Sequence, residues 1–291
     1  MQIERVGSTA DQLGEAICWD HQAKRLYWAD ATGGVIHRLN PATGDREDFK
    51  APSWVGALWL SQSGRIFVNL HNGTYTFNPT TSIVEPYALL DAPEDGVRLN
   101  DAKVDRKGRV ITGTACLDFQ SATNYRGKYF ALDTDRSFRT IENNVGVTNG
   151  PCFSPKGDVL YVADTARRIV WSYDYDAENG NVSGKRTFVD NSILDGAPDG
   201  ATVDAEGCLW QTIVTRGVLL RISPTGKLIT TLPLPIRGPT NVAFAGQQLD
   251  VLYVTSFSRS LTMTASEEGA GGLFAIYDLG VGGLEEARFR D

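Results

Sequence analysis

The sequence has few of the residues that most often build metal sites and covalent nucleophiles. It contains only 3 His among 291 residues, so a histidine-rich metal site is excluded. Its 4 cysteines are Cys18, Cys116, Cys152 and Cys208, and none of them belongs to a C-x-x-C pair. Each has apolar or aromatic neighbours and no cation or histidine beside it in the sequence. We therefore expect four buried free thiols.

Long apolar runs and basic stretches are also absent. No segment approaches the ~20 apolar residues that span a bilayer. The 28 Lys and Arg against 35 Asp and Glu give a net charge of −7, without any basic stripe. Nucleic acid and anionic membrane surfaces are therefore not expected partners. The first residues show no basic segment followed by an apolar core, so no signal peptide is visible and we expect a cytoplasmic protein.

What the sequence does contain is a repeat. A turn followed by an apolar and aromatic strand occurs six times, every 40 to 50 residues, and a second alternating strand follows each copy. A further turn and strand come next, as in "SPTGKLITTLP". The six turn-and-strand segments are "DHQAKRLYWAD", "SQSGRIFVNL", "DRKGRVITGT", "SPKGDVLYVAD", "DAEGCLWQTI" and "AGQQLDVLYVTS".

Four strands recurring at this period indicate the blade of a β-propeller. Six copies predict an all-β, six-bladed propeller that occupies residues 1–291 as a single domain. Little chain follows the second strand of the last copy. We therefore expect the N-terminal segment "QIERV" to join the last blade and close the ring.

Polar residues cluster at one predicted end of this ring. In a blade, the start of the innermost strand and the end of the next strand lie on the same face. Segments entering the inner strands and loops following the second strands should therefore meet at one mouth of the central channel. The polar residues placed there are Glu15, Arg98, Asn100, Asp101, Asn149, Asp199 and Asn241, with Asp118 after a second strand.

Two of these residues are carboxylates converging on a narrow axis. Glu15 and Asp199 would repel each other and raise each other's pKa unless a cation lay between them. A divalent ion held by both and by Asn149 would resolve the repulsion and leave open positions. All-oxygen ligands suit Ca, Mg or Mn, and Zn and Fe(II) also accept them. The alternative for each residue alone is a turn or cap, because Asn149-Gly150 and Asp199-Gly200 are both good turn pairs.

Five of these stretches, in this order and spacing, carry a resemblance to a known family. They are "LGEAICW", "RLNDAKVDRKGR", "TNGPCFSPKGDVLYVADT", "PDGATVDAEGCLW" and "GPTNVAFAGQQLDVLYVTS". From end to end the chain resembles the SMP-30/gluconolactonase/regucalcin-like family of six-bladed propellers. Ala16-Ile17, Pro151-Cys152 and Ala102 depart from the usual family pattern, but none of them removes a ligand.

The resemblance implies one divalent metal held by Glu15, Asn149 and Asp199, and hydrolysis of a sugar-acid lactone such as a glucono- or pentonolactone. It implies that Arg98 and Asn100 bind substrate oxygens and that Asp199 doubles as the catalytic acid–base group. Asp118 falls where some members direct a glutamate toward the sugar. The metal could be Ca, Zn, Mg, Mn or Fe(II). The oligomeric state stays open, and a monomer is compatible with the sequence.

Two other functions are compatible with the same fold. One is hydrolysis of aryl esters or phosphotriesters at the same site, which would require a mainly apolar pocket. The other is a calcium-binding propeller without catalytic activity. No Ser-His-Asp set is available on this face, which disfavours covalent catalysis through serine. The loop 257–272 joins two strands at the same mouth, so we expect it either to form a rim over the site or to be a plain surface loop.

Overall fold

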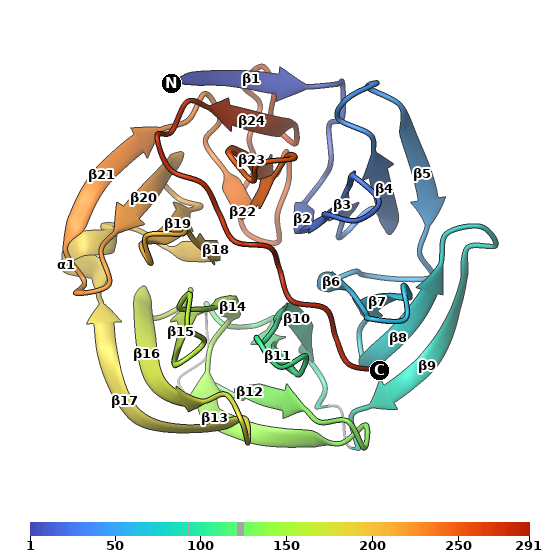
Figure 1. The fold of residues 1–291 in the computed structure, drawn as a ribbon, viewed down its shortest axis with the longest axis vertical. Helices are drawn as coiled ribbons and strands as arrows, with labels where there is room; N and C mark the ends of the chain where they lie inside the picture. Colours follow the sequence, from blue (N-terminus) through green and yellow to red (C-terminus); the bar gives the residue numbers. More distant parts are fainter. Residues whose placement is uncertain (92–93, 121–124) are drawn as a thin grey trace.

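The computed structural model describes residues 1–91, 94–120 and 125–291. Six four-stranded antiparallel sheets stand around a central axis, as Figure 1 shows. The prediction of an all-β, six-bladed propeller is confirmed. No helix in the described ranges is long and apolar enough to cross a membrane.

The first three blades each use four consecutive strands, ordered from the axis outward. They comprise β2 (Gly14–Asp20), β3 (Arg25–Asp30), β4 (Val35–Leu39) and β5 (Arg46–Lys50); β6 (Ala57–Leu60), β7 (Ile66–Asn69), β8 (Gly73–Asn78) and β9 (Ile83–Leu89); and β10 (Val97–Val104), β11 (Val110–Cys116), β12 (Gly127–Leu132) and β13 (Phe138–Val145).

The last three blades follow the same order. They comprise β14 (Thr148–Phe153), β15 (Val159–Asp164), β16 (Ile169–Asp176) and β17 (Asn181–Val189); β18 (Pro198–Val203), β19 (Leu209–Ile213), β20 (Val218–Ile222) and β21 (Leu228–Pro233); and β22 (Pro239–Ala245), β23 (Val251–Ser256), β24 (Leu273–Tyr277) and β1 (Gln2–Val6). One helical turn, α1 (Asn191–Leu194), connects the fourth blade to the fifth.

The N-terminal strand closes the ring. Strand β1 pairs antiparallel with β24, from Gln2 opposite Tyr277 to Val6 opposite Leu273. The last blade is thus built from both ends of the chain, as the sequence predicted. This pairing also removes the open edge that β24 would otherwise present.

The hydrophobic core lies between the blades. Each of the six interfaces has its own cluster of buried side chains from two neighbouring sheets. Between the first and last blades, for example, Leu26 and Trp28 pack with Ala243 and Tyr253. The alternation of apolar residues along the strands supplies these faces.

Five of the six innermost strands contain a bulge near their first residues. In β2, β10, β14, β18 and β22 two residues oppose one residue of the neighbouring strand. Buried polar side chains hold the carbonyl groups that the bulges free: the Thr112 hydroxyl donates to Asp101 O at 3.1 Å. Thr212 contacts Gly200 O and Thr240 O, both at 2.8 Å. Bulges redirect side chains, and here they do so around the channel axis.

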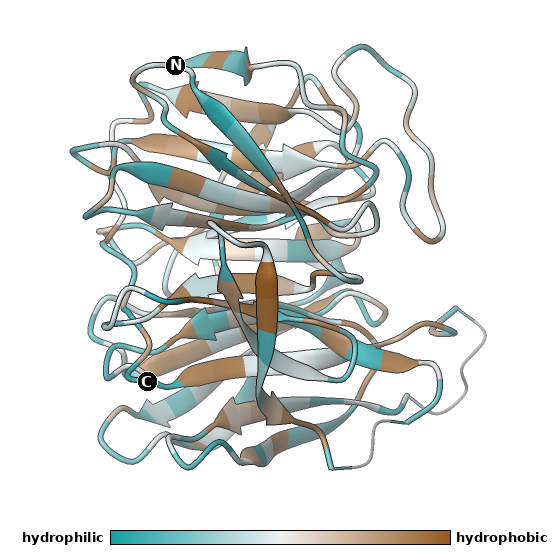
Figure 2. Ribbon diagram, turned by 90° about the vertical axis from the view of Figure 1, so that its right-hand side faces the viewer, coloured by the Kyte–Doolittle hydropathy of each residue, from teal (hydrophilic) through white to brown (hydrophobic). Residues whose placement is uncertain are grey.

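The chain after β24 crosses the middle of the ring and ends at the second blade, drawn in dark red in Figure 1. Phe289 is fully buried against Phe67 and Tyr87, with ring centroids 5.1 and 5.7 Å away. Glu286 lies 2.6 Å from the partly buried Lys103 of the third blade. Burial acts to lower the pKa of that amine, but Glu286 outweighs it and the pKa is raised. In the side view the C-terminus lies on one face of the ring, and long loops extend from the other (Figure 2).

Candidate functional site

A cavity of about 100 Å³ lies where the inner strands begin. It is lined by residues that precede or start the inner strands and by residues that follow the second strands, as the sequence predicted. The predicted residues among them are Glu15, Arg98, Asn100, Asn149 and Asp199. The others are Leu13, Trp54, Phe119, Val147, Thr165, Val214, Phe257, Ser260, Leu261, Thr262 and Met263.

The bulges bring the polar side chains to this cavity. Glu15 and Asn149 directly precede the extra residues of β2 and β14, and Asp199 is the first extra residue of β18. The turn interpretation of Asn149-Gly150 and Asp199-Gly200 is therefore wrong, because both pairs lie inside strands. The sequence could not separate the two cases, since a bulge and a turn use the same residue types.

Close approach of neighbouring inner strands explains the two glycines. A Cβ atom at Gly200 would lie 2.5 Å from the side chain of Asn241, and one at Gly150 would lie 2.9 Å from Asp199 O. Gly150 also has φ of +55°. Ala16 takes a similar left-handed conformation, with φ of +58°, directly after Glu15. These positions thus let the strands pack tightly around the axis.

The cavity floor carries an excess of buried negative charge. Burial and then the charges of Asp199 and Asp101 raise the pKa of Glu15 well above its usual value. Burial and then Asp101 raise the pKa of Asp199 in the same way. Arg98 opposes both shifts. Glu15 and Asp199 therefore share one guanidinium, and the nearby Asp101 adds to the negative charge that they feel, an arrangement that favours a further cation.

Asp101 has a different environment from the other two carboxylates. Its oxygens accept hydrogen bonds from Ala102 N at 2.8 Å and Gly150 N at 2.9 Å. Its carboxylate therefore fixes the backbone of two blades. In contrast, no described residue donates a hydrogen bond to the Asp199 carboxylate, which lines the cavity.

Arg98 is held at the cavity by an aromatic ring. Its guanidinium carbon lies 3.4 Å from the centroid of Trp54, a short stacking contact. Its Nη1 group donates to Asn100 Oδ1 at 2.5 Å and to Leu99 O at 3.3 Å. Across the described ranges, its Nε and Nη2 groups have no hydrogen-bond acceptor. Burial lowers the pKa of Arg98 to about 9, so the group stays charged at neutral pH.

A hydrogen-bond chain links three blades through the candidate ligand Asn149. Asn100 Nδ2 donates to Asn149 Oδ1 at 2.9 Å, and Asn149 Nδ2 donates to Thr165 Oγ1 at 2.8 Å. Thr165 Oγ1 in turn donates to Pro198 O at 2.7 Å, directly before Asp199. Because a hydroxyl has only one proton, Thr165 must accept from Asn149. This fixes which end of the Asn149 amide points toward Asn100.

These residues fit a divalent cation. Glu15, Asn149 and Asp199 offer oxygen donors. Glu15 and Asp199 together carry one more charge than Arg98 balances, and Asp101 adds to the negative field, so a cation would relieve the repulsion. Asn149 Oδ1 uses one lone pair for Asn100 and keeps a second. Within the described chain no group of three His, Cys, Asp or Glu side chains is arranged to hold a metal. The candidate set differs from such a group by its amide ligand.

Several lining residues were missed in the sequence. Trp54 belongs to an apolar stretch before β6, at the place where other blades carry polar residues. The aromatic side chain of Trp54 was the only feature of that stretch that could have indicated a lining residue. Thr165, Phe119 and Val214 follow second strands and had no distinguishing pattern. The predicted rim is confirmed for Ser260 to Met263, which line the cavity.

The predicted substrate residue Asp118 does not line the cavity, although its neighbour Phe119 does. Its side chain is 55% exposed, and its carboxylate lies 3.3 Å from Arg126. The acidic character of Asp118 therefore did not predict which residue of this loop lines the cavity.

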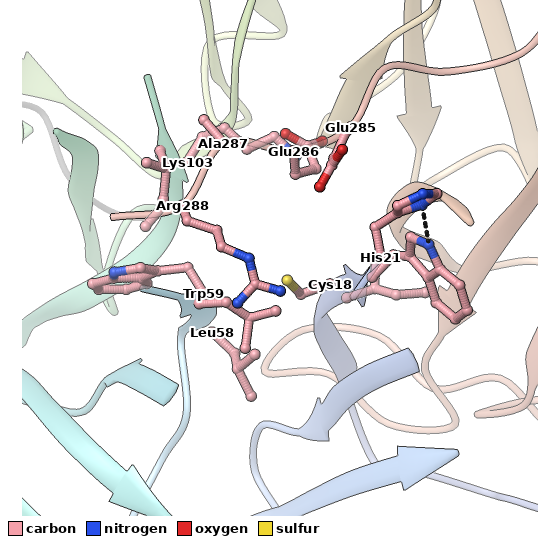
Figure 3. A pocket seen from close by; sticks show the side chains of 14 residues that line it. Cys18, His21, Leu58, Trp59, Lys103, Glu285, Glu286, Ala287 and Arg288 are labelled. Atoms are coloured by element: carbon pink, nitrogen blue, oxygen red, sulfur yellow. Dashed lines mark hydrogen bonds and ion pairs between the residues drawn. The ribbon is translucent and has the colours of Figure 1, made fainter. Parts of the chain in front are cut away.

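A second cavity lies at the other end of the inner strands, under the C-terminal tail (Figure 3). Two ion pairs lie at it: Lys103 with Glu286, and Arg288 with Asp20 at 2.5 Å. At about 40 Å³ it has space for a few water molecules. Cys18 lines it and is only partly buried, so the prediction of buried thiols is confirmed for Cys116, Cys152 and Cys208 and holds only in part for Cys18. Burial still raises the pKa of Cys18 to about 12, which makes it unreactive.

Known proteins are similar to this chain in sequence and in fold. Residues 13–258 match the model of the SMP-30/gluconolactonase/LRE-like region. A pentonolactonase, XacC, from Haloferax volcanii is 32% identical over 294 residues, covering 99% of this chain and 98% of the relative. A 6-deoxy-6-sulfogluconolactonase from Pseudomonas putida is 34% identical over 246 residues, covering 84% of this chain and 83% of the relative.

A solved structure of a luciferin-regenerating enzyme superposes with a TM-score of 0.93 at 26% identity, covering 100% of this chain and 99% of that one. The family match extends over most of the chain and includes all five inner strands that carry bulges. The chain therefore belongs to the SMP-30/gluconolactonase/LRE-like family.

Proposed function

We propose that this protein is a lactonase that hydrolyses a sugar-acid lactone to the open-chain acid with the aid of one divalent metal ion. The observation that carries the proposal is that the buried carboxylates of Glu15 and Asp199 and the guanidinium of Arg98 line one cavity. The relatives named as lactonases over nearly the whole chain support the reaction class.

Glu15, Asn149 and Asp199 would hold the metal. When bound, it would supply Lewis-acid polarisation of the lactone carbonyl. Ca, Mg, Mn, Zn and Fe(II) are all compatible with three oxygen ligands. The excess carboxylate charge on the floor supports a cation, and the amide of Asn149 keeps the ligand set from being fully anionic.

Asp199 acts as general base and acid in this proposal. Its carboxylate accepts a proton from the attacking water, and the water oxygen forms a bond to the carbonyl carbon. The bond from that carbon to the ring oxygen then breaks, and Asp199 returns the proton to the leaving oxygen. A carboxylate that lines the cavity and accepts no hydrogen bond from the described residues has lone pairs available for this proton.

Arg98 and Asn100 orient the substrate. The Nε and Nη2 groups of Arg98 match carbonyl and hydroxyl oxygens on the substrate. Asn100 Oδ1 accepts a 2.5 Å hydrogen bond from Arg98 Nη1 and so fixes the guanidinium, which therefore meets the substrate in one orientation. Asp118, with its exposed carboxylate beside Arg126, has no role in this proposal.

The test is a hydrolysis assay near neutral pH on sugar lactones, paraoxon and phenyl acetate, before and after EDTA treatment. We expect lactone hydrolysis that EDTA abolishes and that one of Ca, Mg, Mn, Zn or Fe(II) restores. Faster cleavage of paraoxon or phenyl acetate would instead support the ester-hydrolase alternative. Metal binding without any hydrolysis would support a non-catalytic propeller.

A further inference from the structure

The lining of the cavity divides into a polar floor and an apolar wall. The floor carries all of the charged and amide groups of the site. The apolar lining residues are Leu13, Trp54, Phe119, Val147, Val214, Phe257, Leu261 and Met263. A fully hydroxylated sugar carries hydroxyl groups on every side, and each of them needs a hydrogen-bond partner when it is buried. The charged and amide groups of this cavity instead gather at one end, and Thr165, Ser260 and Thr262 add only hydroxyl groups to the rest of the lining.

The wall is part of a packed hydrophobic cluster. Leu13, Val214 and Phe257 are buried together with Ala31 and Ala197. Trp54, Met263 and Ala265 are partly buried and pack against this cluster, and Trp54 and Met263 also line the cavity. Because its members come from the first, fifth and last blades and are buried, the wall is a fixed surface of the propeller.

The loop that completes the wall is held by hydrogen bonds. Ser260 N donates to Met263 O at 2.8 Å, and Ser260 Oγ accepts from Met263 N at 3.0 Å. Arg259 N also donates to Gln12 O at 2.8 Å, which ties the loop to the segment before β2. The hydroxyl of Ser260 is thus engaged within its own turn. Leu261, at the loop tip, is 55% exposed and lines the cavity.

One orientation of the substrate matches both the polar floor and the apolar wall of the cavity. Its carbonyl must reach the carboxylate pair on the floor, and its nearest hydroxyls then face the unpaired N–H groups of Arg98. The chain that ends in carbon 6 is attached to the ring carbon that bears the ring oxygen, and it extends out of the ring toward the wall and the loop. A terminal hydroxyl packed against Leu261 and Met263 would lose water without a hydrogen-bond partner on either side chain, whereas a methyl group would not.

We propose that this site selects 6-deoxyhexonolactones, in which a methyl group replaces the terminal hydroxymethyl group, and that Leu261 and Met263 determine this preference. The inference rests on the proposed lactonase function. An apolar pocket discriminates against an added hydroxyl group by at most about a hundredfold. We therefore expect kcat/KM to favour the deoxy lactone by about 10- to 100-fold.

Two matched pairs of substrates test the preference. L-fucono-1,4-lactone differs from L-galactono-1,4-lactone only at carbon 6, and L-rhamnono-1,4-lactone differs from L-mannono-1,4-lactone in the same way. Initial rates are measured at neutral pH with the metal that gives the highest rate, and the spontaneous rate is subtracted. The ratio of kcat/KM within each pair isolates the contribution of the terminal group.

The variants Leu261→Asn and Met263→Gln keep the side-chain size and introduce an amide. Both ratios should fall toward one, while the metal affinity stays at the wild-type value. Leu228→Asn, on the outer strand β21 and 37% exposed, is the matched control and should keep both ratios. A thermal melt of each variant checks that the fold persists.

Equal rates within the pairs, or faster hydrolysis of the hydroxylated members, would overturn the inference while leaving the lactonase function intact. A deoxy preference that persists in both variants would also overturn it, because the preference would then arise elsewhere. If none of the four is hydrolysed above the spontaneous rate but a glucono- or pentonolactone is, the inference fails and the lactonase function stands; if no sugar lactone is hydrolysed, the proposed function fails as well.

Discussion

Asp199 combines two properties that a turn residue would not need. It is buried in strand β18 and lines the cavity, and burial together with Asp101 raises the pKa of its carboxyl. Gln211 Nε2 holds the carbonyl of the same residue at 2.9 Å, so its backbone is fixed. The backbone of Asp199 is thus held in place, while its carboxyl group faces the cavity.

Asp199→Asn should keep a measurable metal affinity and lose most of the activity. The amide can still offer an oxygen to a metal but cannot accept a proton. We expect kcat to fall by about 10²- to 10⁴-fold, the usual contribution of general-base catalysis. The measurement is kcat at saturating metal near neutral pH, with spontaneous hydrolysis subtracted. A variant that keeps more than about a tenth of the wild-type kcat would exclude Asp199 as the base.

Thr165 is a positioning residue that acts on the metal site through Asn149. Its hydroxyl joins the Asn149 amide to Pro198 O, so it fixes the amide and the backbone before Asp199 together. Thr165→Val removes the hydroxyl at nearly constant size. We expect a metal affinity weaker by about 10- to 100-fold, the usual effect of losing a group that orients a ligand. Titration calorimetry with the metal alone measures this.

Thr165→Ser is the matched control, because serine keeps the hydroxyl. Its metal affinity should return to near the wild-type value. If the valine variant binds metal as tightly as the wild type, Asn149 either needs no orienting group or is not a ligand. The calorimetric readout is independent of hydrolysis, so this experiment does not depend on the choice of lactone.

At the scale of the strand, the repeat was predictable and the bulges were not. Alternating apolar residues and the turn before each second strand mark six copies, and β1 joins the last blade as expected. The bulges depend on contacts between blades, such as Thr212 bridging Gly200 and Thr240 across two inner strands. Such contacts have no local pattern, since Gln211 and Thr212 appear only as polar residues inside an apolar strand.

The candidate site was predictable to the extent that the strand order fixes it. Glu15, Asn149 and Asp199 occupy equivalent starts of inner strands, so the ring itself brings them together. Trp54 and Met263 depend on how a loop and an apolar stretch fold over the mouth. Asp118 was predicted from the same loop that supplies Phe119, and one residue decides which side chain faces the cavity.

Strand β4 carries a buried histidine between two carboxylates. His37 contacts Asp11 Oδ1 at 3.1 Å and Asp48 Oδ1 at 2.7 Å, and its ring stacks on Trp28. Both ring nitrogens can donate at once only in the imidazolium form. Burial acts to lower the pKa of His37, but the two carboxylates outweigh it and the pKa is raised. Arg46 also pairs with Asp48, at 3.0 Å.

The raised pKa of His37 predicts a pH dependence of stability. The folded state binds this proton more tightly than the unfolded chain, so its contribution is complete below pH of about 6.5, the ordinary histidine value. It is lost as pH rises through the folded pKa. The free energy of unfolding should therefore fall from about pH 6 toward alkaline pH, measured by urea titration. His37→Gln should remove this fall, and the exposed His71→Gln should keep it; an unchanged slope in His37→Gln would contradict the assignment.

At the scale of the whole molecule, both ends of the chain hold the ring together. Strand β1 closes the last blade, and the C-terminal tail crosses the face opposite the candidate site (Figure 1). Along its path Ala205 N donates to Gly282 O at 2.9 Å in the fifth blade, and Arg290 N donates to Gly108 O at 2.8 Å in the third. Arg288 reaches Asp20 of the first blade, so the tail connects blades that share no strand pairing.

Phe289→Ala should therefore destabilise the propeller without changing the cavity. The side chain is fully buried against Phe67 and Tyr87, and its removal leaves a void that costs about 3–5 kcal/mol. Urea unfolding measures the loss, and kcat/KM for the best lactone at low temperature should stay at the wild-type value because the tail is remote from Glu15 and Asp199. Arg290→Ala, next along the tail and exposed, should shift stability by no more than about 0.5 kcal/mol. If Phe289→Ala unfolds at the same urea concentration as Arg290→Ala, the tail only covers the channel and the six interfaces between blades hold the ring without it.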